Sequence, residues 1–286
     1  MLVFSIMRID IGNVIKLAER TGRQVLRKLQ AKDFQVEQKK DGTPVTTLDI
    51  EAADLIREGL HQITPSIPVI TEEDKDSINV VNAKLSQPIK WFVDPIDGTR
   101  TAIDYAQGKP NHDGWGIHIG LVENNKPEKG VVYFPARSEG TIYFTGNDGK
   151  AYKKVGDDIP KQISVKSLPE QGAIDVSLGW QKNEHPEQIG GREYNPICSV
   201  GGERVCLVAD GTSHIGWLNG PFAPWDIAAS HAVLRAANGE IVTSEHDGQD
   251  LDYSDEKLVL KPGVAGALDS LIRLGYCSNK QLCDQA

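Results

Sequence analysis

Apolar and polar positions in the first sixty residues follow the period of an α-helix. Apolar residues recur at intervals of three and four after Asp10, and Asp10 can cap the helix that this spacing predicts as far as about Gln30. Residues 39–44 (KKDGTP) predict a turn, and the same helical period returns over residues 48–60. The chain is therefore expected to begin with two amphipathic helices.

After residue 60, short apolar runs and strict alternation replace the helical period, which predicts strands and hairpins. In the first half the expected strands cover residues 68–71, 89–93, 115–123 and 131–135, with a turn over 124–130 and a further hairpin over 141–154 that turns at Asp148-Gly149. In the second half we expect strands over residues 173–179, 195–200, 213–218, 240–244 and 257–261, and helices over 204–209, 225–237 and 264–274. The change of rhythm predicts an α+β domain over residues 1–160 and an α/β domain over residues 161–286.

Composition and charge limit what the chain can do. Its 286 residues are 39% hydrophobic and 25% charged, which is typical of a globular protein with a large core. The net charge of −9 argues against a partner that is a nucleic-acid polymer or an anionic membrane. No segment approaches the ~20 apolar residues that span a bilayer, and the short apolar start lacks a basic leader. A small anionic substrate stays compatible if a bound cation inverts the local field.

The cysteines give a weaker signal. Cys198, Cys206, Cys277 and Cys283 form no CxxC pair and have no histidine cluster beside them. We expect free thiols in a reducing cytoplasm, and a disulfide between Cys277 and Cys283 remains the alternative.

Acidic residues stand where strands end and where helices begin. Asp49 and Asp226 open predicted helices, where an acid can serve simply as a cap. Glu72 follows the strand over 68–71 and could belong to a solvated loop, and Asp94 and Asp97 could form a plain turn in DPIDGT. Each position taken alone can be explained as a helix cap, a solvated loop or a turn, with no role in catalysis or metal binding.

Taken together, these positions favour a metal site. Asp94 and Asp97 end a buried apolar strand, where like charges raise each other's pKa unless a cation lies between them. The backbone carbonyl of Ile96 can join the two carboxylates, and an all-oxygen set suits Mg²⁺ or Mn²⁺ rather than Zn²⁺. Gly98-Thr99 then opens a helix or turn whose N–H groups can hold an anion. A metal beside such amides is suited to cleaving a phosphate ester.

The stretches TEED, WFVDPIDGTRT and PWDIAASHAVLRAANGE resemble the inositol monophosphatase superfamily, and the resemblance covers nearly the whole chain. KDGTPVTTLDIEAADLI, GVVYFPA and DGQDLDYSDEKLVLKPG are most like the 3'(2'),5'-bisphosphate nucleotidases of that superfamily. The resemblance implies an α+β fold, namely a layered αβαβα sandwich of the inositol monophosphatase and fructose-1,6-bisphosphatase type. Its first sheet would be mostly antiparallel, and its second sheet would belong to an α/β layer.

The resemblance also implies a role for each acidic residue. Glu72 and Asp94 would hold one Mg²⁺ with the Ile96 carbonyl, and Asp94, Asp97 and Asp226 would hold a second. Mn²⁺ is a possible substitute, and lithium sensitivity is a property of the family.

The remaining roles concern water and substrate. Asp49 and Thr99 would orient the attacking water, and Asp49 would help to seat a weaker third ion. The residues expected to contact the substrate are Asp97, Gly98, Thr99, Gly201, Gly202, Arg204 and Asp226.

The leaving group is less well defined than the chemistry. Residues 100–101 and 106–116 depart from the nucleotidase pattern, and SVGGERVC is shorter than the corresponding loop. The favoured substrate is adenosine 3',5'-bisphosphate, with AMP and phosphate as products, and the alternative is myo-inositol monophosphate or a related sugar phosphate. Arg204 could contact a second phosphate or could equally lie on the surface. A non-catalytic module that senses metals or anions is the alternative of another class.

Two further matters stay open at this stage. The sequence itself does not give the oligomeric state, and the expectation of a homodimer rests only on the family resemblance. His112, Asp113 and Trp115 could line the mouth of the pocket or merely cap a longer hairpin.

Overall fold

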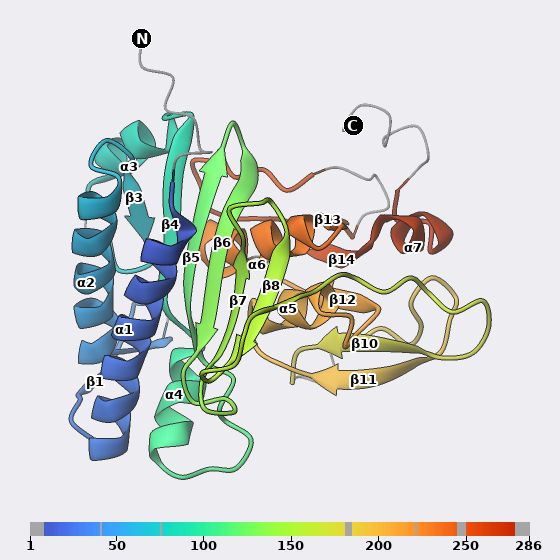
Figure 1. Cartoon of the computed structure of the whole chain (residues 1–286), viewed down its shortest axis with the longest axis horizontal. Helices are drawn as coiled ribbons and strands as arrows, with labels where there is room; N and C mark the ends of the chain where they lie inside the picture. Colours follow the sequence, from blue (N-terminus) through green and yellow to red (C-terminus); the bar gives the residue numbers. More distant parts are fainter. Residues whose placement is uncertain are drawn as a thin grey trace.

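The computed structural model describes residues 9–40, 42–74, 76–180, 185–220, 222–244 and 250–277. Within these residues the elements form layers in the order helices, sheet, helices, sheet, helix (Figure 1). This arrangement confirms the expected α+β layered sandwich. Each layer buries an apolar face against the next, which is how amphipathic elements share a core.

The outer helices form because both begin at strong N-terminal caps. Helix α1 (Ile11–Ala31) follows Asp10, whose side chain accepts a hydrogen bond from the Gly12 N–H at 3.0 Å. Helix α2 (Thr47–Ile63) follows Thr46, and both helices pack against the first sheet on one side. A short antiparallel pair, β1 (Val36–Gln38) and β2 (Pro44–Thr46), connects them.

The first sheet is mostly antiparallel, as predicted, and only β3 and β4 run parallel to each other. Its order is β3 (Val69–Thr71), β4 (Ile89–Asp97), β5 (Gly116–Glu123), β6 (Lys126–Phe134), β7 (Thr141–Thr145), β8 (Ala151–Val155) and β9 (Lys161–Gln162). Helix α3 (Ile78–Leu85) lies between β3 and β4 in sequence, and α4 (Thr99–Ala106) follows β4.

The turn of the first hairpin is shorter than expected. It consists of Asn124 and Asn125, both with positive φ, instead of residues 124–130. Asparagine tolerates the left-handed region that a two-residue hairpin turn requires. Residues 126–130 therefore join β6, and the register shifts once between Leu121 and Val122.

The second sheet combines parallel and antiparallel strands. Its order is β11 (Tyr194–Cys198), β10 (Ile174–Leu178), β12 (Ile215–Leu218), β14 (Gly263–Ala267) and β13 (Gly239–Thr243). Helices α5 (Glu203–Ala209) and α6 (Pro224–Ala236) lie between the two sheets, and α7 (Leu268–Arg273) lies on the outer side (Figure 1).

Two predictions near the end of the chain were wrong. Residues 257–261 form no strand, and Leu260 alone makes an isolated bridge to Phe222. Residues 264–267 belong to β14 rather than to the last helix, which begins at Leu268. At Gly266 an added Cβ would lie 2.9 Å from the Ile215 side chain and 3.2 Å from that of Leu271, so packing against these side chains leaves little room there.

Helix α6 connects the two halves of the molecule. The largest hydrophobic cluster joins Phe92 and Val132 of the first sheet to Ile227 and Val233 of this helix. An added Cβ at Gly130 would lie 2.0 Å from the Ala229 carbonyl oxygen, so only glycine permits this approach. The division into domains near residue 160 stays a prediction, and the shared cluster shows that both halves contribute to one core.

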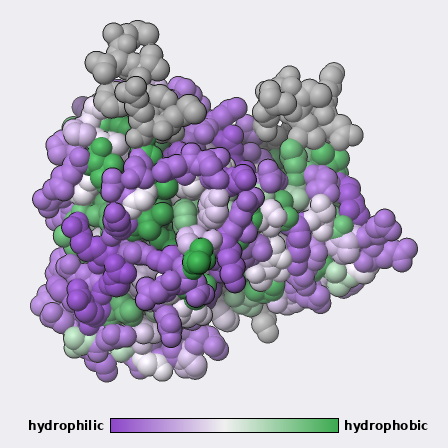
Figure 2. Space-filling view, in the orientation of Figure 1, coloured by the Kyte–Doolittle hydropathy of each residue, from purple (hydrophilic) through white to green (hydrophobic). Residues whose placement is uncertain are grey.

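The visible molecular surface has the hydrophilic character expected of a globular protein. The face in Figure 2 is mainly hydrophilic, and its hydrophobic residues lie in small separate groups. Among the described residues, no helix has the length and apolar character needed to cross a bilayer. Cys198, Cys206 and Cys277 are free thiols, whereas Cys283, which the alternative disulfide would require, lies outside the described residues.

Candidate active site

Strand β4 carries the DPID segment as its buried end. The register against β5 places Asp94 opposite His118 and Asp97 opposite Gly116, so β4 has one extra residue between these pairs. Such a bulge bends the strand and changes the direction of its side chains. The Ile96 N–H donates to Asp94 Oδ1 at 3.0 Å, which stabilises this bend. Both aspartates are buried, at 2% and 7% exposure, so the apolar strand does bring two carboxylates into the interior.

Asp49 combines the capping role with a contact to the end of β4. Its Oδ2 accepts hydrogen bonds from the Thr46 N–H at 2.7 Å and the Thr46 hydroxyl at 2.6 Å, which makes it part of a capping box. Its Oδ1 accepts a hydrogen bond from the Thr99 hydroxyl at 2.9 Å. Burial raises the pKa of Asp49 although the bonds from Thr46 and Thr99 favour the charged form. The helix cap therefore also holds a carboxylate beside the first residue of α4.

Asp226 is supplied by helix α6, in the second half of the chain. It lies in the first turn of α6, and its Oδ2 accepts a hydrogen bond from the Ala223 N–H at 2.9 Å. Burial and the charge of Asp97 raise the pKa of Asp226 to about 8. The electrostatic influence of Asp97 shows that residues 129 positions apart in sequence lie close enough to interact.

Glu72 is paired with a cation that the sequence did not single out. Lys39 Nζ lies 2.5 Å from Glu72 Oε1 and 2.8 Å from Glu73 Oε1. Burial would lower the pKa of Lys39, but its bonds to the two glutamates raise it above its ordinary range. The pKa of Glu72 is also raised, chiefly by burial. Lysine in a predicted turn is ordinarily solvated, so only the presence of Glu72 nearby could have identified it.

The electrostatics of these groups are centred on Asp94. Burial raises its pKa well above the ordinary value, and the charges of Glu72, Asp97, Asp226 and Asp49 raise it further. Such a set of carboxylates is unstable as anions unless positive charge is shared among them. The donor atoms are oxygens, which are the ligands of Mg²⁺ and similar hard cations. By this test the residues fit a divalent cation.

Four of these acidic residues, Glu72, Asp94, Asp97 and Asp226, line one hollow of about 720 Å³, whereas Asp49 does not. The hollow is lined by Lys39, Thr43, Pro44, Glu72, Asp94, Ile96, Asp97, Gly98, Thr99, Arg100, Gly201, Phe222, Ala223, Trp225 and Asp226. Within the described residues, no three His, Cys, Asp or Glu side chains are gathered closely enough to enclose an ion as they stand. Direct contact of three carboxylates costs free energy without a shared cation, and Glu72 contacts Lys39 instead.

The turn before α5 approaches Asp97 from the second half of the chain. The Gly202 N–H donates to Asp97 Oδ2 at 3.3 Å, and an added Cβ at Gly201 would lie 2.2 Å from both carboxylate oxygens of Asp97. Gly201 also has a φ of +27°, which favours glycine. Gly202 and Arg204 do not line the hollow themselves. Arg204 donates to Asn219 at 3.3 Å, and its guanidinium lies 5.9 Å from the ring centre of Phe222, which does line the hollow.

His118 is a buried residue at this site that the sequence analysis missed. Its Nδ1 lies 3.2 Å from the Asp226 carbonyl oxygen and its Nε2 lies 3.5 Å from Asp97 Oδ2. Burial lowers the pKa of His118 although Asp97 opposes this shift. The available signal was a lone polar side chain within the apolar run GIHIGLV.

The three unexplained residues of the loop after α4 separate into different environments. Trp115 is fully buried in a cluster with Leu48 and Ile96, so it does not lie at a pocket mouth. His112 contacts the Pro110 carbonyl oxygen at 2.6 Å, and Asp113 pairs with Arg137 at 3.1 Å. These contacts give the loop a structural role in the described fold.

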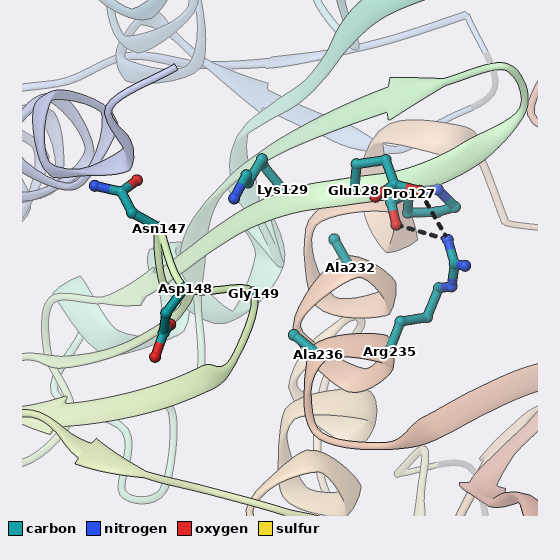
Figure 3. Close-up of a pocket in the computed structure, with 9 residues that line it drawn as sticks. All are labelled: Pro127, Glu128, Lys129, Asn147, Asp148, Gly149, Ala232, Arg235 and Ala236. Atoms are coloured by element: carbon teal, nitrogen blue, oxygen red, sulfur yellow. Dashed lines mark hydrogen bonds and ion pairs between the residues drawn. The ribbon is translucent and has the colours of Figure 1, made fainter. Parts of the chain in front are cut away.

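A second hollow of about 550 Å³ contains none of the predicted site residues. It lies between the β7–β8 turn, the start of β6 and helix α6 (Figure 3). Lys129 Nζ donates to the Gly146 carbonyl oxygen at 3.2 Å, and Arg235 donates to the Pro127 carbonyl oxygen at 2.9 Å. Its polar groups thus make contacts within the fold, and the carboxylates described above remain the candidate site.

Comparison with known proteins finds relatives that match along nearly the whole chain. The sequence model of the inositol monophosphatase family matches residues 10–274. The 3'(2'),5'-bisphosphate nucleotidase CysQ of Salmonella typhimurium is 33% identical over 254 residues, which cover 87% of this chain and 96% of that protein. CysQ of Escherichia coli strain K12 is also 33% identical, over 258 residues that cover 88% and 97%. The crystal structure of the extragenic suppressor protein SuhB from Bartonella henselae shares the fold, with a TM-score of 0.70 at 19% identity, over 93% of this chain and 96% of that one.

Proposed function

Because the chain belongs to the inositol monophosphatase family, we propose that it is a metal-dependent phosphomonoesterase that acts on 3'(2'),5'-bisphosphate nucleotides. The preferred substrate is adenosine 3',5'-bisphosphate, which is hydrolysed to AMP and phosphate. One observation carries the chemistry: carboxylates from β4, from the segment after β3 and from α6 meet on one hollow and raise the pKa of Asp94 together. Such a constellation holds divalent cations for phosphate chemistry.

The ligands proposed for the cations all lie on the surface of that hollow. Glu72, Asp94 and the Ile96 carbonyl would hold one ion, and Asp94, Asp97 and Asp226 would hold the second; all five residues line the hollow. When bound, the ions neutralise charge on the phosphate and on the departing oxygen and lower the pKa of a bound water. Lys39 pairs with Glu72 Oε1 in this structure, so an ion that binds this oxygen would displace Lys39.

The proton acceptor in this scheme is the pair formed by Thr99 and Asp49. The Thr99 hydroxyl gives its hydrogen to Asp49 Oδ1, so a lone pair of Thr99 Oγ1 can accept a proton from the attacking water. Asp49 takes the hydroxyl proton in the same event. The two bonds from Thr46 hold Asp49 in place, and the raised pKa makes its carboxylate a stronger base. Asp49 does not line the hollow and therefore acts through Thr99.

The transferred phosphate is proposed to bind at the start of α4. Gly98, Thr99 and Arg100 line the hollow, and Gly98 has a φ of +80° at the N-cap position. The first N–H groups of a helix have no partners within the helix and attract anions. The N–H groups of Gly98 and Thr99 are therefore the proposed donors to the phosphate, next to Asp97 in the chain.

The rest of the substrate is proposed to lie toward the second half of the chain. Phe222 and Trp225 line that side of the hollow and offer apolar contact for a nucleoside, and Arg204, above Phe222, is proposed to contact the second phosphate. Gly201 lines the hollow beside Asp97, and the N–H of the neighbouring Gly202 donates to the Asp97 carboxylate. A sugar monophosphate would leave these contacts unused.

Phosphate release from a small panel tests the proposal. Adenosine 3',5'-bisphosphate, AMP and myo-inositol 1-phosphate are assayed under identical Mg²⁺ conditions, and kcat/KM is compared. We expect the bisphosphate to be preferred by about tenfold or more, since one charge-assisted contact contributes ~1.5–3 kcal/mol. Preference for the inositol phosphate would establish the alternative substrate class. Calorimetric binding of Mg²⁺ and nucleotide without turnover would establish the non-catalytic sensing module instead.

The finer properties follow from the same proposal. We propose two or three Mg²⁺ ions with Mn²⁺ as a substitute, inhibition by lithium, a cytoplasmic location and a possible homodimer. The free thiols of Cys198, Cys206 and Cys277 are compatible with a reducing compartment. Ion titration of activity, lithium inhibition curves and sedimentation analysis test these points separately.

A further inference from the structure

His118 occupies the space between the two segments that supply Asp97 and Asp226. It lies in the middle of β5, is fully buried, and stands opposite Asp94 in the register with β4. Its Nδ1 lies 3.2 Å from the backbone carbonyl oxygen of Asp226, and its Nε2 lies 3.5 Å from Asp97 Oδ2. A single ring therefore contacts both halves of the acidic site.

The chemistry of these contacts assigns a different role to each nitrogen. A carbonyl oxygen can only accept, so Nδ1 carries the hydrogen that it donates to Asp226. Within the part of the chain that the structure describes, Nε2 is buried and has no hydrogen-bond partner. An unpartnered buried nitrogen costs free energy, and a phenylalanine ring would fill the same space without that cost. The specific contribution of the histidine is therefore the bond from Nδ1 to α6, while the Nε2 side of the ring lies beside Asp97.

Packing shows that the ring also limits the turn before α5. An added Cβ at Gly202 would lie 2.6 Å from His118 Cε1 and 2.9 Å from the Asp226 carbonyl oxygen. The Gly202 N–H in turn donates to Asp97 Oδ2 at 3.3 Å. Phe134 holds the ring edge-on from another side, with ring centres 6.1 Å apart. The ring of His118 is thus packed on several sides, and its contacts can hold Asp97 and the start of α6 in fixed positions.

We propose that His118 is a positioning residue that sets the spacing between Asp97 and Asp226 and thereby the affinity for the cation that they share. The identity of that cation rests on the proposed function. Residues that orient metal ligands without touching the metal change affinity by about 10–100-fold when they are replaced. His118 is expected to act in this way, with a smaller effect on the stability of the fold than on ion binding.

The test compares His118→Phe and His118→Asn with the same two changes at His231. Phenylalanine keeps an aromatic ring but donates nothing. The amide nitrogen of asparagine can occupy the position of Nδ1 and donate to Asp226, but the side chain is too short to reach Asp97. His231 is a matched control, because it is buried on α6 and contacts Tyr253 and Glu240 rather than a proposed ligand. Mg²⁺ affinity is measured by calorimetry without substrate, and urea unfolding is followed on every variant.

We expect His118→Phe to weaken Mg²⁺ binding by about tenfold or more and His118→Asn to show an intermediate loss, with both His231 variants close to wild type. If the phenylalanine variant does not fold, the comparison of the two asparagine variants decides the matter. Wild-type affinity in the His118 variants, or an equal loss in the His231 variants, would overturn the proposal, as would a wild-type protein that binds no Mg²⁺. A wild-type protein that binds Mg²⁺ but releases no phosphate would refute the proposed function alone, since the calorimetric comparison stays informative.

Discussion

Asp49→Asn separates the proposed catalytic role of this residue from its role as a helix cap. In the wild-type structure, Asp49 Oδ2 accepts two bonds from Thr46 and Oδ1 accepts the hydrogen of Thr99. Asparagine keeps one oxygen, which can retain both bonds from Thr46. Its amide nitrogen then faces Thr99 and donates to the hydroxyl oxygen. The direction of that hydrogen bond is reversed, and Thr99 loses the acceptor that receives its proton.

The expected loss of kcat is about 10²–10⁴-fold, the usual contribution of a general base. At about 1.36 kcal/mol per factor of ten, this loss corresponds to ~2.7–5.4 kcal/mol of transition-state stabilisation. Stability should not fall in parallel. Because burial raises the pKa of Asp49 in the folded state, its ionised form opposes folding above that pKa, and the penalty disappears as the pH falls below the unfolded value. The asparagine variant removes this penalty, so its free energy of unfolding at neutral pH should equal or exceed that of wild type.

The assay is phosphate release at saturating Mg²⁺ and substrate, together with urea unfolding of the same preparations. Asp10→Asn is the control, since Asp10 is an exposed cap of α1 and asparagine caps equally well. A kcat reduced by less than about tenfold would contradict the role of Asp49 in proton transfer. A parallel collapse of stability would show that the capping role dominates.

Further predictions concern the ions and the contact between the two halves. Asp94→Asn should abolish Mg²⁺-dependent turnover yet raise the urea midpoint at neutral pH, because burial and the charge of Glu72 raise the pKa of Asp94; an unchanged or lower midpoint would contradict this reasoning. Chelation by EDTA should stop phosphate release, and restored Mg²⁺ at about 100 times its Kd should stabilise the fold by ~2.7 kcal/mol in a thermal melt, so a melting temperature insensitive to Mg²⁺ would count against the site. Gly130→Ala should lower the free energy of unfolding by about 1–3 kcal/mol, because its Cβ would lie 2.0 Å from the Ala229 carbonyl oxygen, whereas Gly220→Ala, with no atom within 4 Å, serves as the control in urea unfolding.

Much of the fold could be predicted from periodicity, and the errors have physical causes. Helices α1 and α2 and the strands of the first sheet carry clear periods, because each buries one face. Residues 263–267 gave no such signal, since GVAGA is compatible with a helix until the neighbouring strands are known. Residues 257–261 form a short apolar run that is typical of a strand, but in the described fold only Leu260 pairs, in an isolated bridge to Phe222.

The acidic members of the site could be predicted because carboxylates are unusual at the end of a buried strand. The structure brings Glu72, Asp94, Asp97 and Asp226 onto one hollow, and Asp49 reaches it through Thr99. Lys39 could not be identified from the sequence, and the lone histidine in GIHIGLV marks His118 only weakly, because the importance of both residues depends on contacts with Glu72 and Asp226 that only the fold creates. The assignment of these residues as ligands and catalytic groups remains a prediction for the experiments above.

The close approach of α6 to the first sheet has a consequence for how the protein can move. Ala229 of the helix lies against Gly120 and Gly130 with no side chain between the backbones, and Asp226 is on the first turn of the same helix. The two sides of the hollow are therefore held together by direct backbone contact. A hinge motion that separated them would have to disrupt the hydrophobic core. Substrate entry and product release would instead depend on local movements of residues that line the hollow, such as release of Lys39 from Glu72. Neither half, produced as a separate fragment, should possess a working cleft.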